Sequence, residues 1–124
     1  MATSSPPPMQ WVSALSKQPS LEAAIAEVVE QATSALSAPP NLAIVFISSA
    51  FTSEYPRLMP LLQTYLPAIP VIGCGGAGVV GMTPSQQPRE VEGAAAIALT
   101  LAYLPEVNVH PFHLEPDGLP DLDS

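Results

Sequence analysis

Two short apolar runs in the chain each lead directly into a cluster of small residues. Residues 42–47 (LAIVFI) are followed by Ser-Ser-Ala at 48–50, and residues 69–72 (IPVI) are followed by the glycine-rich run at 73–78. Short apolar runs bounded by small residues are typical of buried β-strands. At the end of such a strand, small residues leave space for a ligand to approach the backbone. The pattern therefore predicts two strands and a ligand site where they end.

The spacing of apolar residues predicts two amphipathic helices. Ser20 is the expected N-cap of the first, and the Pro-Pro pair at 39–40 stops it. Its apolar positions recur at helical spacing: Leu21, Ala24, Ile25, Val28, Ala32, Ala35 and Leu36. Thr52 or Ser53 is the expected N-cap of the second helix, and Pro60 is expected to kink it or delay its start. The apolar set of this second helix is Tyr55, Leu58, Met59, Leu62, Tyr65 and Leu66.

The first apolar run has the pattern of an interior strand. Residues 42–47 are apolar on both alternating faces, which favours a central strand that is covered on both sides. With the second helix and residues 69–72, this run forms a strand-helix-strand unit, for which a right-handed parallel crossover is expected. A further short strand is expected at residues 11–15.

The second half of the chain predicts antiparallel strands. Residues 79–82 form a short strand. Within residues 90–104, large side chains stand at every second position from Ile97 to Tyr103 with small ones between them, which predicts one long strand with a bulky face and a smooth alanine face. Residues 107–114 are expected to pair with it. The predicted fold class is therefore α/β: a mixed β-sheet with a parallel β-α-β core plus antiparallel strands, with helices packed on it, in a single small domain.

The composition fits one folded domain and excludes several functions. The 124 residues are 48% hydrophobic and 11% charged, which is typical of a folded chain. We expect a flexible leader at residues 1–10, the domain at 11–114 and an acidic flexible tail at 115–124. The formal net charge of -8 opposes binding to nucleic acids and to anionic membranes. The longest apolar stretch, residues 93–104, is shorter than the ~20 residues that a membrane span needs.

The N-terminus and the single cysteine indicate the compartment. One cysteine cannot form an internal disulfide, and the N-terminal residues lack the basic and apolar regions of a signal peptide. We therefore expect a cytoplasmic protein.

The glycine-rich run allows three interpretations. Gly73, Gly75 and Gly78 match G-x-G-x-x-G, but a dinucleotide site also needs a helix that starts inside the motif. Residues 79–84 are β-branched and end in proline, so they do not predict one. The glycines also suit a tight turn between strands that requires positive φ, or a ligand floor lined by backbone. The turn is the simplest of the three.

Other residues that carry chemistry have structural interpretations beside the functional ones. Cys74 is a candidate nucleophile, but no cation or helix N-terminus is evident beside it, so core packing is favoured. His110 and His113 would face opposite sides of a strand, which excludes joint zinc ligation. Glu90 and Glu92 share a strand face and either hold a polar ligand or form a solvated edge. No metal or cofactor is expected.

The hydroxyl residues after the first apolar run have two possible roles. Ser48, Ser49 and Thr52 either cap the second helix or donate their hydroxyl groups to a ligand carboxylate. Capping is favoured, because a helix start needs that chemistry whether or not a ligand binds.

The ordered series of motifs resembles the N-terminal part of the FIST domain. The resemblance is carried by the run at 42–47, by Val-Ile-Gly-Cys at 71–74 with Ala-Gly at 77–78, and by Val-Glu-Gly at 91–93 before an apolar strand. It spans residues 11–114. FIST domains are regarded as intracellular sensory modules of signal-transduction proteins and some F-box proteins, and the resemblance implies binding of small ligands such as amino acids. It also implies a larger unit, in which this part packs against a C-terminal FIST part.

On this resemblance we expect a non-catalytic cytoplasmic domain that binds a small ligand in signal transduction. The expected ligand-binding residues are Ser48, Ser49, Thr52, Gly73, Cys74, Gly75, Gly76, Gly78 and Glu92. The main alternative is an interaction or self-association module, including a homodimer, that uses the smooth alanine face of residues 90–104. A third interpretation is an enzyme that uses Cys74.

Overall fold

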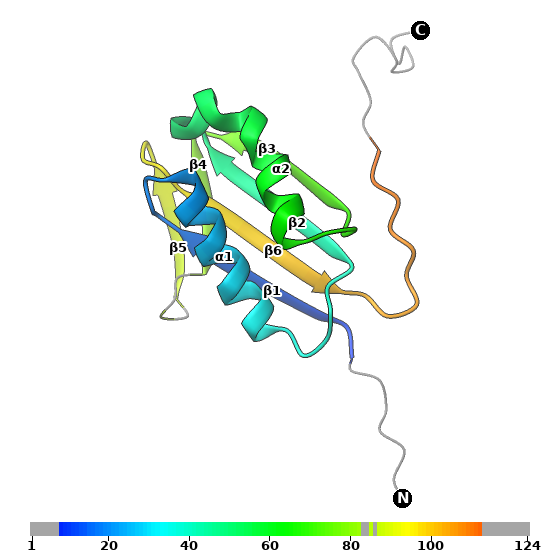
Figure 1. Ribbon diagram of the computed structural model, residues 1–124. Coiled ribbons are helices and arrows are strands. Elements are labelled where there is room, and N and C mark those ends of the chain that lie inside the picture. The colour runs from blue at the N-terminus through cyan, green and yellow to red at the C-terminus, as the bar shows by residue number, and fades with distance from the viewer. Residues whose placement is uncertain (1–7, 83–84, 86, 113–124) are drawn as a thin grey trace, which may run out of the picture.

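The architecture combines one four-stranded sheet, two α-helices and a separate β-hairpin (Figure 1). The computed structural model describes residues 8–82, 85 and 87–112. In chain order the elements are β1 (Gln10–Ser16), α1 (Leu21–Ala35), β2 (Leu42–Ser48), the 3-10 helix η1 (Ser49–Glu54), α2 (Tyr55–Tyr65), β3 (Val71–Gly76), β4 (Gly78–Met82), β5 (Pro88–Glu92) and β6 (Ile97–Tyr103).

The sheet is mixed, as predicted, and its strand order is β1-β6-β2-β3. β2 and β3 run parallel, with Ala43 opposite Val71 and Ser48 opposite Gly76. β6 lies antiparallel between β1 and β2. The strand-helix-strand unit of β2, α2 and β3 is confirmed, and β2 is an interior strand. β3 forms one edge of the sheet.

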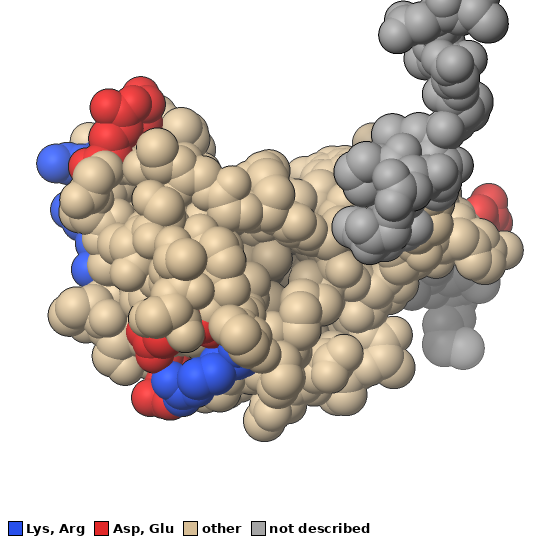
Figure 2. Space-filling model, turned by 90° about the horizontal axis from the view of Figure 1, so that it is seen from above, with Lys and Arg blue, Asp and Glu red and all other residues tan. Residues whose placement is uncertain are grey.

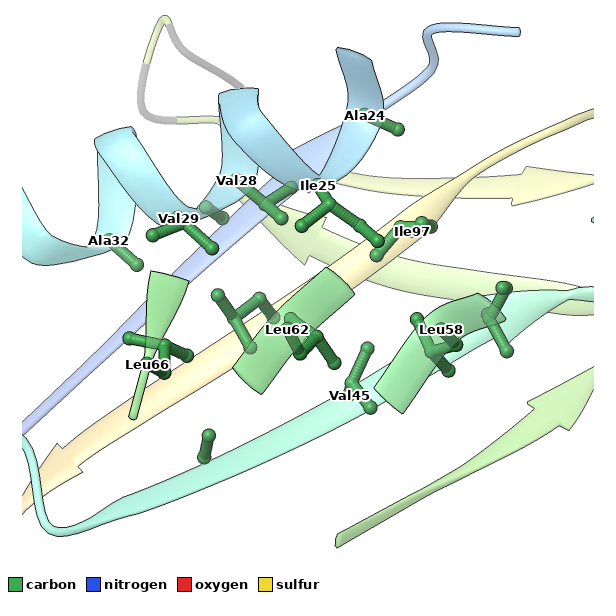
Figure 3. Packing of buried hydrophobic residues seen from close by; sticks show 14 of the residues in the cluster. Ala24, Ile25, Val28, Val29, Ala32, Val45, Leu58, Leu62, Leu66 and Ile97 are labelled. Carbon is green, nitrogen blue, oxygen red and sulfur yellow. The ribbon is translucent and has the colours of Figure 1, made fainter. Parts of the chain in front are cut away.

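Both helices pack on one face of the sheet and enclose the main core (Figures 1 and 3). The predicted cap of α1 is confirmed, because the Ser20 side chain accepts a hydrogen bond from the Ala23 amide at 3.4 Å. From α2, Leu58, Leu62 and Leu66 point toward the sheet. The core residues labelled in Figure 3 are Ala24, Ile25, Val28, Val29, Ala32, Val45, Leu58, Leu62, Leu66 and Ile97.

The β4-β5 hairpin packs on the opposite face of the sheet and covers only one end of it. A second buried cluster forms there from Leu15, Val79, Val91, Ala96 and Ala98. Beyond the hairpin, this face presents large apolar side chains to solvent. Half of Trp11 is exposed, and so are 42% of Phe46 and 43% of Ile72. The expectation that β2 is covered on both sides is therefore wrong for its Phe46 end.

The predicted strand over residues 90–104 is two strands. β5 and β6 are separated by a bend at Gly93, where φ is +69°, and they belong to different sheets. The alternation of large and small residues begins only at Ile97, after the run of small residues at 93–96 that contains the bend. The small residues of this region do not form an exposed smooth face, because Ala96, Ala98 and Ala102 are buried.

The segment after β6 does not form the expected strand. Residues 107–112 have no strand assignment, and residues 113 and 114 lie outside the described residues. The place beside β6 that a following strand would take is occupied on both sides, by β1 and β2. Asn41 fixes the end of β6: its Nδ2 donates to the Leu104 carbonyl at 2.7 Å, and its Oδ1 accepts from the Leu104 amide at 2.8 Å.

The first strand is joined to the end of α1 by the side chain of its first residue. β1 begins at Gln10, whose side chain donates to the Ala35 carbonyl and accepts from the Ser37 amide at 2.9 Å. These bonds connect β1 to the end of α1. Residues 1–7 of the expected leader and the whole of the expected tail, residues 115–124, fall outside the part of the chain that the structure describes.

Candidate functional site

The end of β2 is organised by a buried serine. Ser48 is 1% exposed, and its hydroxyl accepts a hydrogen bond from the Ala50 amide at 3.2 Å, which caps η1. Ser49 and Thr52 are exposed, and the Thr52 hydroxyl donates to the Ser49 carbonyl. Of the three hydroxyl residues, Ser48 therefore has a capping role, but the helix that it caps is η1 and not α2.

The prediction that Thr52 or Ser53 caps α2 is wrong. Glu54 occupies the N-cap position without a side-chain cap bond, and Thr52 and Ser53 lie within η1. Pro56 lies in the first turn of α2, where its missing amide removes one of the donors that a cap would satisfy. The helix begins at Tyr55 and contains Pro60.

Tyr55 links the end of β2 to the start of α2. Its hydroxyl donates to the Ser48 carbonyl at 3.3 Å, and its ring end lies against Gly75 of β3. Sequence reasoning treated Tyr55 only as part of the apolar face of the second helix. The one signal that could have revealed this role is its position, at the start of the helix that follows the Ser-rich strand end.

Two glycines of β3 are required by close approach and not by a turn. A Cβ atom at Gly73 would lie 2.3 Å from the Val45 carbonyl oxygen, and a Cβ atom at Gly75 would lie 2.4 Å from the Tyr55 hydroxyl. Both residues are in extended strand, and among the described glycines only Gly93 has positive φ. The interpretation of the glycine run as a tight turn with positive φ is therefore wrong. The strand β4, and not a helix, follows the run, as expected from its sequence.

A recess lies between α2 and β3, and Gly73 and Gly75 border it. Its volume is about 200 Å³. Its walls come from α2, from the buried face of β2 and from β3, and the lining residues are Val45, Ile47, Tyr55, Leu58, Met59, Gly73, Cys74 and Gly75. A larger hollow of about 420 Å³ lies on the outer side of β3, lined by Met59, Val71, Ile72, Gly73, Pro111 and Phe112. Met59 and Gly73 border both spaces.

The structure brings three of the nine predicted site residues into this recess. Gly73, Cys74 and Gly75 line it, and Ser48 borders it through the bond from Tyr55. Cys74 is exposed and lies opposite Phe46, and strand alternation directs its side chain to the sheet face away from α2. The thiol therefore points away from the recess that its backbone lines.

The remaining predicted site residues lie elsewhere. Gly76 ends β3, and Gly78 begins β4 opposite Glu92. A Cβ atom at Gly78 would lie 2.9 Å from the Glu92 Cγ atom, so this glycine serves the hairpin pairing. None of these three residues lines either hollow, and neither does Ser49 or Thr52. The expected single site is thus divided between the recess and the surface around it.

Glu90 and Glu92 lie on the same face of β5, as predicted. A side-chain hydrogen bond with Glu92, reinforced by the repulsion between the two carboxylates, raises the pKa of Glu90 above its ordinary value. The Glu90 carboxyl therefore keeps its proton to a higher pH than an isolated glutamate does. Across residues 8–82, 85 and 87–112, no cluster of three or more metal-ligating side chains occurs, and His113 is outside this range.

Charged side chains lie away from the recess. Arg57 of α2 forms ion pairs with Glu22 of α1 and with Glu54, the latter at 2.8 Å. Seen from above, most charged side chains gather in two groups on the left of the molecule, and a further acidic side chain lies at its right end (Figure 2). No charged residue is among those that line the recess.

Comparison with known proteins places the chain in a family. The model of the FIST N domain matches residues 41–112, which is more than half of the chain. The chain belongs to the FIST N domain family. The matched segment of this FIST N domain contains β2, α2, β3 and the hairpin, so it includes every residue of the recess.

The family assignment supports a role in sensing or signalling. FIST N domains form a family of sensory and signalling domains. Comparison with curated proteins finds no match for the chain. The helices described for this FIST N domain are all too short or too polar to cross a membrane.

Proposed function

We propose that this FIST N domain is a non-catalytic, cytoplasmic sensory domain that binds a small molecule in the recess between α2 and β3. One observation carries the proposal: a space of about 200 Å³ lies between α2 and the edge strand β3, bordered by Gly73 and Gly75. Ligand sites are usually preformed concave spaces with apolar walls and a few polar groups. The recess has this character.

The position of the recess suits a sensor. A ligand there would contact Leu58 and Met59 of α2 and the backbone of β3 at the same time. It would therefore favour the arrangement in which α2 and β3 lie at the distance that fits the ligand. A ligand shifts a conformational equilibrium only through such a difference in affinity between two arrangements. The signal would leave the domain as a change in the position of α2.

A thermal-shift screen tests this function. Any compound that binds only the folded chain raises its melting temperature in proportion to the logarithm of the compound's concentration at saturation. The set contains amino acids, the class that the family resemblance implied, together with nucleotides and small uncharged organic molecules. At least one compound is expected to raise the melting temperature reproducibly. If no compound does so, the chain is not a small-molecule sensor of this kind.

A second function is favoured by the open part of the sheet. Trp11, Phe46 and Ile72 are each about half exposed on the face opposite the helices. Contiguous exposed apolar side chains are typical of interaction surfaces. The partner would be a second copy of the chain or a C-terminal FIST part. Light scattering that gives a dimer, together with a screen in which no compound raises the melting temperature, would favour this function over ligand binding.

A further inference from the structure

The walls of the recess are almost entirely apolar. Val45 and Ile47 belong to the buried face of β2, and Leu58 and Met59 come from α2. Gly73 and Gly75 complete the boundary with backbone alone. A ligand that fills this space removes apolar surface from water on several sides, and that removal favours binding. The ligand must therefore carry an apolar body.

The polar groups of the recess are neutral and few. The Tyr55 hydroxyl already donates to the Ser48 carbonyl. The Ala43 amide donates to the Pro70 carbonyl at 2.9 Å. In a parallel pair, alternate residues of one strand direct their N–H and C=O groups toward the other strand, so even-numbered residues of β3 face β2. The N–H and C=O groups of Gly73 and Gly75 therefore point away from β2. These groups are at the open edge of the sheet. They suit one uncharged hydroxyl or carbonyl group of a ligand.

The recess offers no partner for a charge. Arg57, the basic residue of α2, pairs with Glu22 and Glu54. The other basic residues of the sequence, Lys17 and Arg89, lie after β1 and in β5. A zwitterion would have to lose hydration from an ammonium and a carboxylate without gaining an opposite charge, which is costly. The net charge of -8 also opposes anionic ligands.

We infer that the recess between α2 and β3 accepts an uncharged molecule the size of one ring with a single hydroxyl or carbonyl group, in preference to a zwitterionic amino acid. This inference rests on the proposed function and names the ligand class for the same recess. The volume agrees with it: an apolar cavity of about 150 Å³ holds a benzene molecule, and the recess measures about 200 Å³.

Two compounds with the same ring separate the ligand classes. Benzyl alcohol carries one hydroxyl group and no charge, and L-phenylalanine carries the same ring on a zwitterion. Each is titrated into the ¹⁵N-labelled chain while amide chemical shifts are recorded. Benzyl alcohol is expected to shift the Gly73 and Gly75 amides saturably, with the amide of Gly81 in the β4-β5 hairpin as a reference outside the recess. L-Phenylalanine is expected to bind at least about tenfold more weakly, which corresponds to ~1.4 kcal/mol.

The results of these two titrations separate failure of the inferred ligand class from failure of the proposed function. If L-phenylalanine shifts the same amides with equal or higher affinity, the inferred ligand class is wrong and ligand binding in the recess stands. If neither compound shifts the Gly73 and Gly75 amides, the inferred class is wrong; if the broader thermal-shift screen is also negative, the proposed function fails with it.

A matched pair of glycine variants tests the location. Gly75→Ala places a methyl group against Tyr55 and reduces the recess, so benzyl alcohol is expected to bind about tenfold more weakly. Gly76→Ala is the control, because its new Cβ atom lies 3.3 Å from the Gly78 carbonyl oxygen and outside the recess. Met59→Glu, at a wall residue that is 38% exposed, gives a second blocking variant if Gly75→Ala does not fold. Unchanged affinity in the folded blocking variant would overturn the inference.

Discussion

Gly73 should be the least replaceable glycine of this FIST N domain, although it lies in an exposed edge strand. A Cβ atom there would lie 2.3 Å from the Val45 carbonyl oxygen and 2.4 Å from the Val45 Cγ1 atom. Both distances are far below van der Waals contact. The carbonyl belongs to the backbone of interior strand β2, so a side-chain rotation cannot relieve the first clash. Gly73→Ala therefore forces β3 away from β2.

The magnitude follows from two opposing effects. Overpacking a tightly packed site costs about 1–3 kcal/mol. Replacing glycine by alanine also reduces the entropy of the unfolded chain, which stabilises the fold by about 0.4–1 kcal/mol where no clash occurs. For Gly73→Ala the clash is with rigid backbone, so the first effect prevails and a net loss of about 1–2 kcal/mol is expected. At Gly76 the nearest atom to a new Cβ is 3.3 Å away, so the two effects nearly cancel.

Urea denaturation of the wild type and both variants measures this difference. The free energy of unfolding of Gly73→Ala should fall by the amount above, while that of Gly76→Ala should stay within about 0.5 kcal/mol of the wild type. The slope of the free energy against urea concentration should not change, because the fold is retained. Equal stability of Gly73→Ala and Gly76→Ala would refute the argument that close approach to β2, and not turn geometry, requires glycine at position 73.

Three further predictions concern the core, a capping bond and a titration. Leu62→Ala, at a side chain of α2 that is 0% exposed, should lower the free energy of unfolding by about 2–5 kcal/mol, and the exposed Met9→Ala should leave it nearly unchanged. Ser20→Ala should lower it by about 1 kcal/mol, measured by the same denaturation, and Ser20→Asp should restore it because aspartate also caps helices. Carbon-detected NMR should find that Glu90 titrates above its ordinary pKa. Glu92→Gln should lower the pKa of Glu90, and the control Glu106→Gln should not. An unchanged pKa of Glu90 in Glu92→Gln would contradict the interaction between the two carboxyl groups. Because the folded-state pKa of Glu90 is raised, any stability that depends on it is present at low pH and is lost as pH rises through that pKa.

Local patterns in the sequence predicted most of the elements. The period of apolar residues and the cap at Ser20 fixed α1, and the apolar run at 42–47 fixed β2 as an interior strand. These features depend on residues close together in the chain. The parallel pairing of β2 with β3 followed from the helix between them, because a helical crossover of that length favours neighbouring parallel strands.

Long-range pairing was the part that the sequence did not predict. β6 inserts between β1 and β2, which lie more than 50 residues earlier in the chain, and nothing in its own alternation identifies those partners. The prediction extended the alternation that begins at Ile97 back across the small residues at 93–96, and so it missed the break between β5 and β6. The exposure of Phe46 was also missed, because the pattern of apolar residues in a strand is the same whether or not another element covers that face.

The sequence indicated some of the residues that line the recess but not its walls. The sequence located it at the glycines after the second apolar run, and Gly73, Cys74 and Gly75 do line the recess. It did not show that Tyr55 would lie over Gly75 or that Leu58 and Met59 would supply a wall, because these contacts depend on how α2 packs. It also grouped Glu92 and Gly78 with the site, although they belong to the hairpin.

A crystal of this FIST N domain under xenon pressure would test the central claim most directly. Xenon enters apolar spaces without needing hydrogen bonds, so it reports the recess apart from any choice of ligand. We expect a xenon atom between α2 and β3, in contact with Leu58, Met59 and the backbone of Gly73. A crystal in which Tyr55 or Met59 fills that space and no xenon binds there would contradict it.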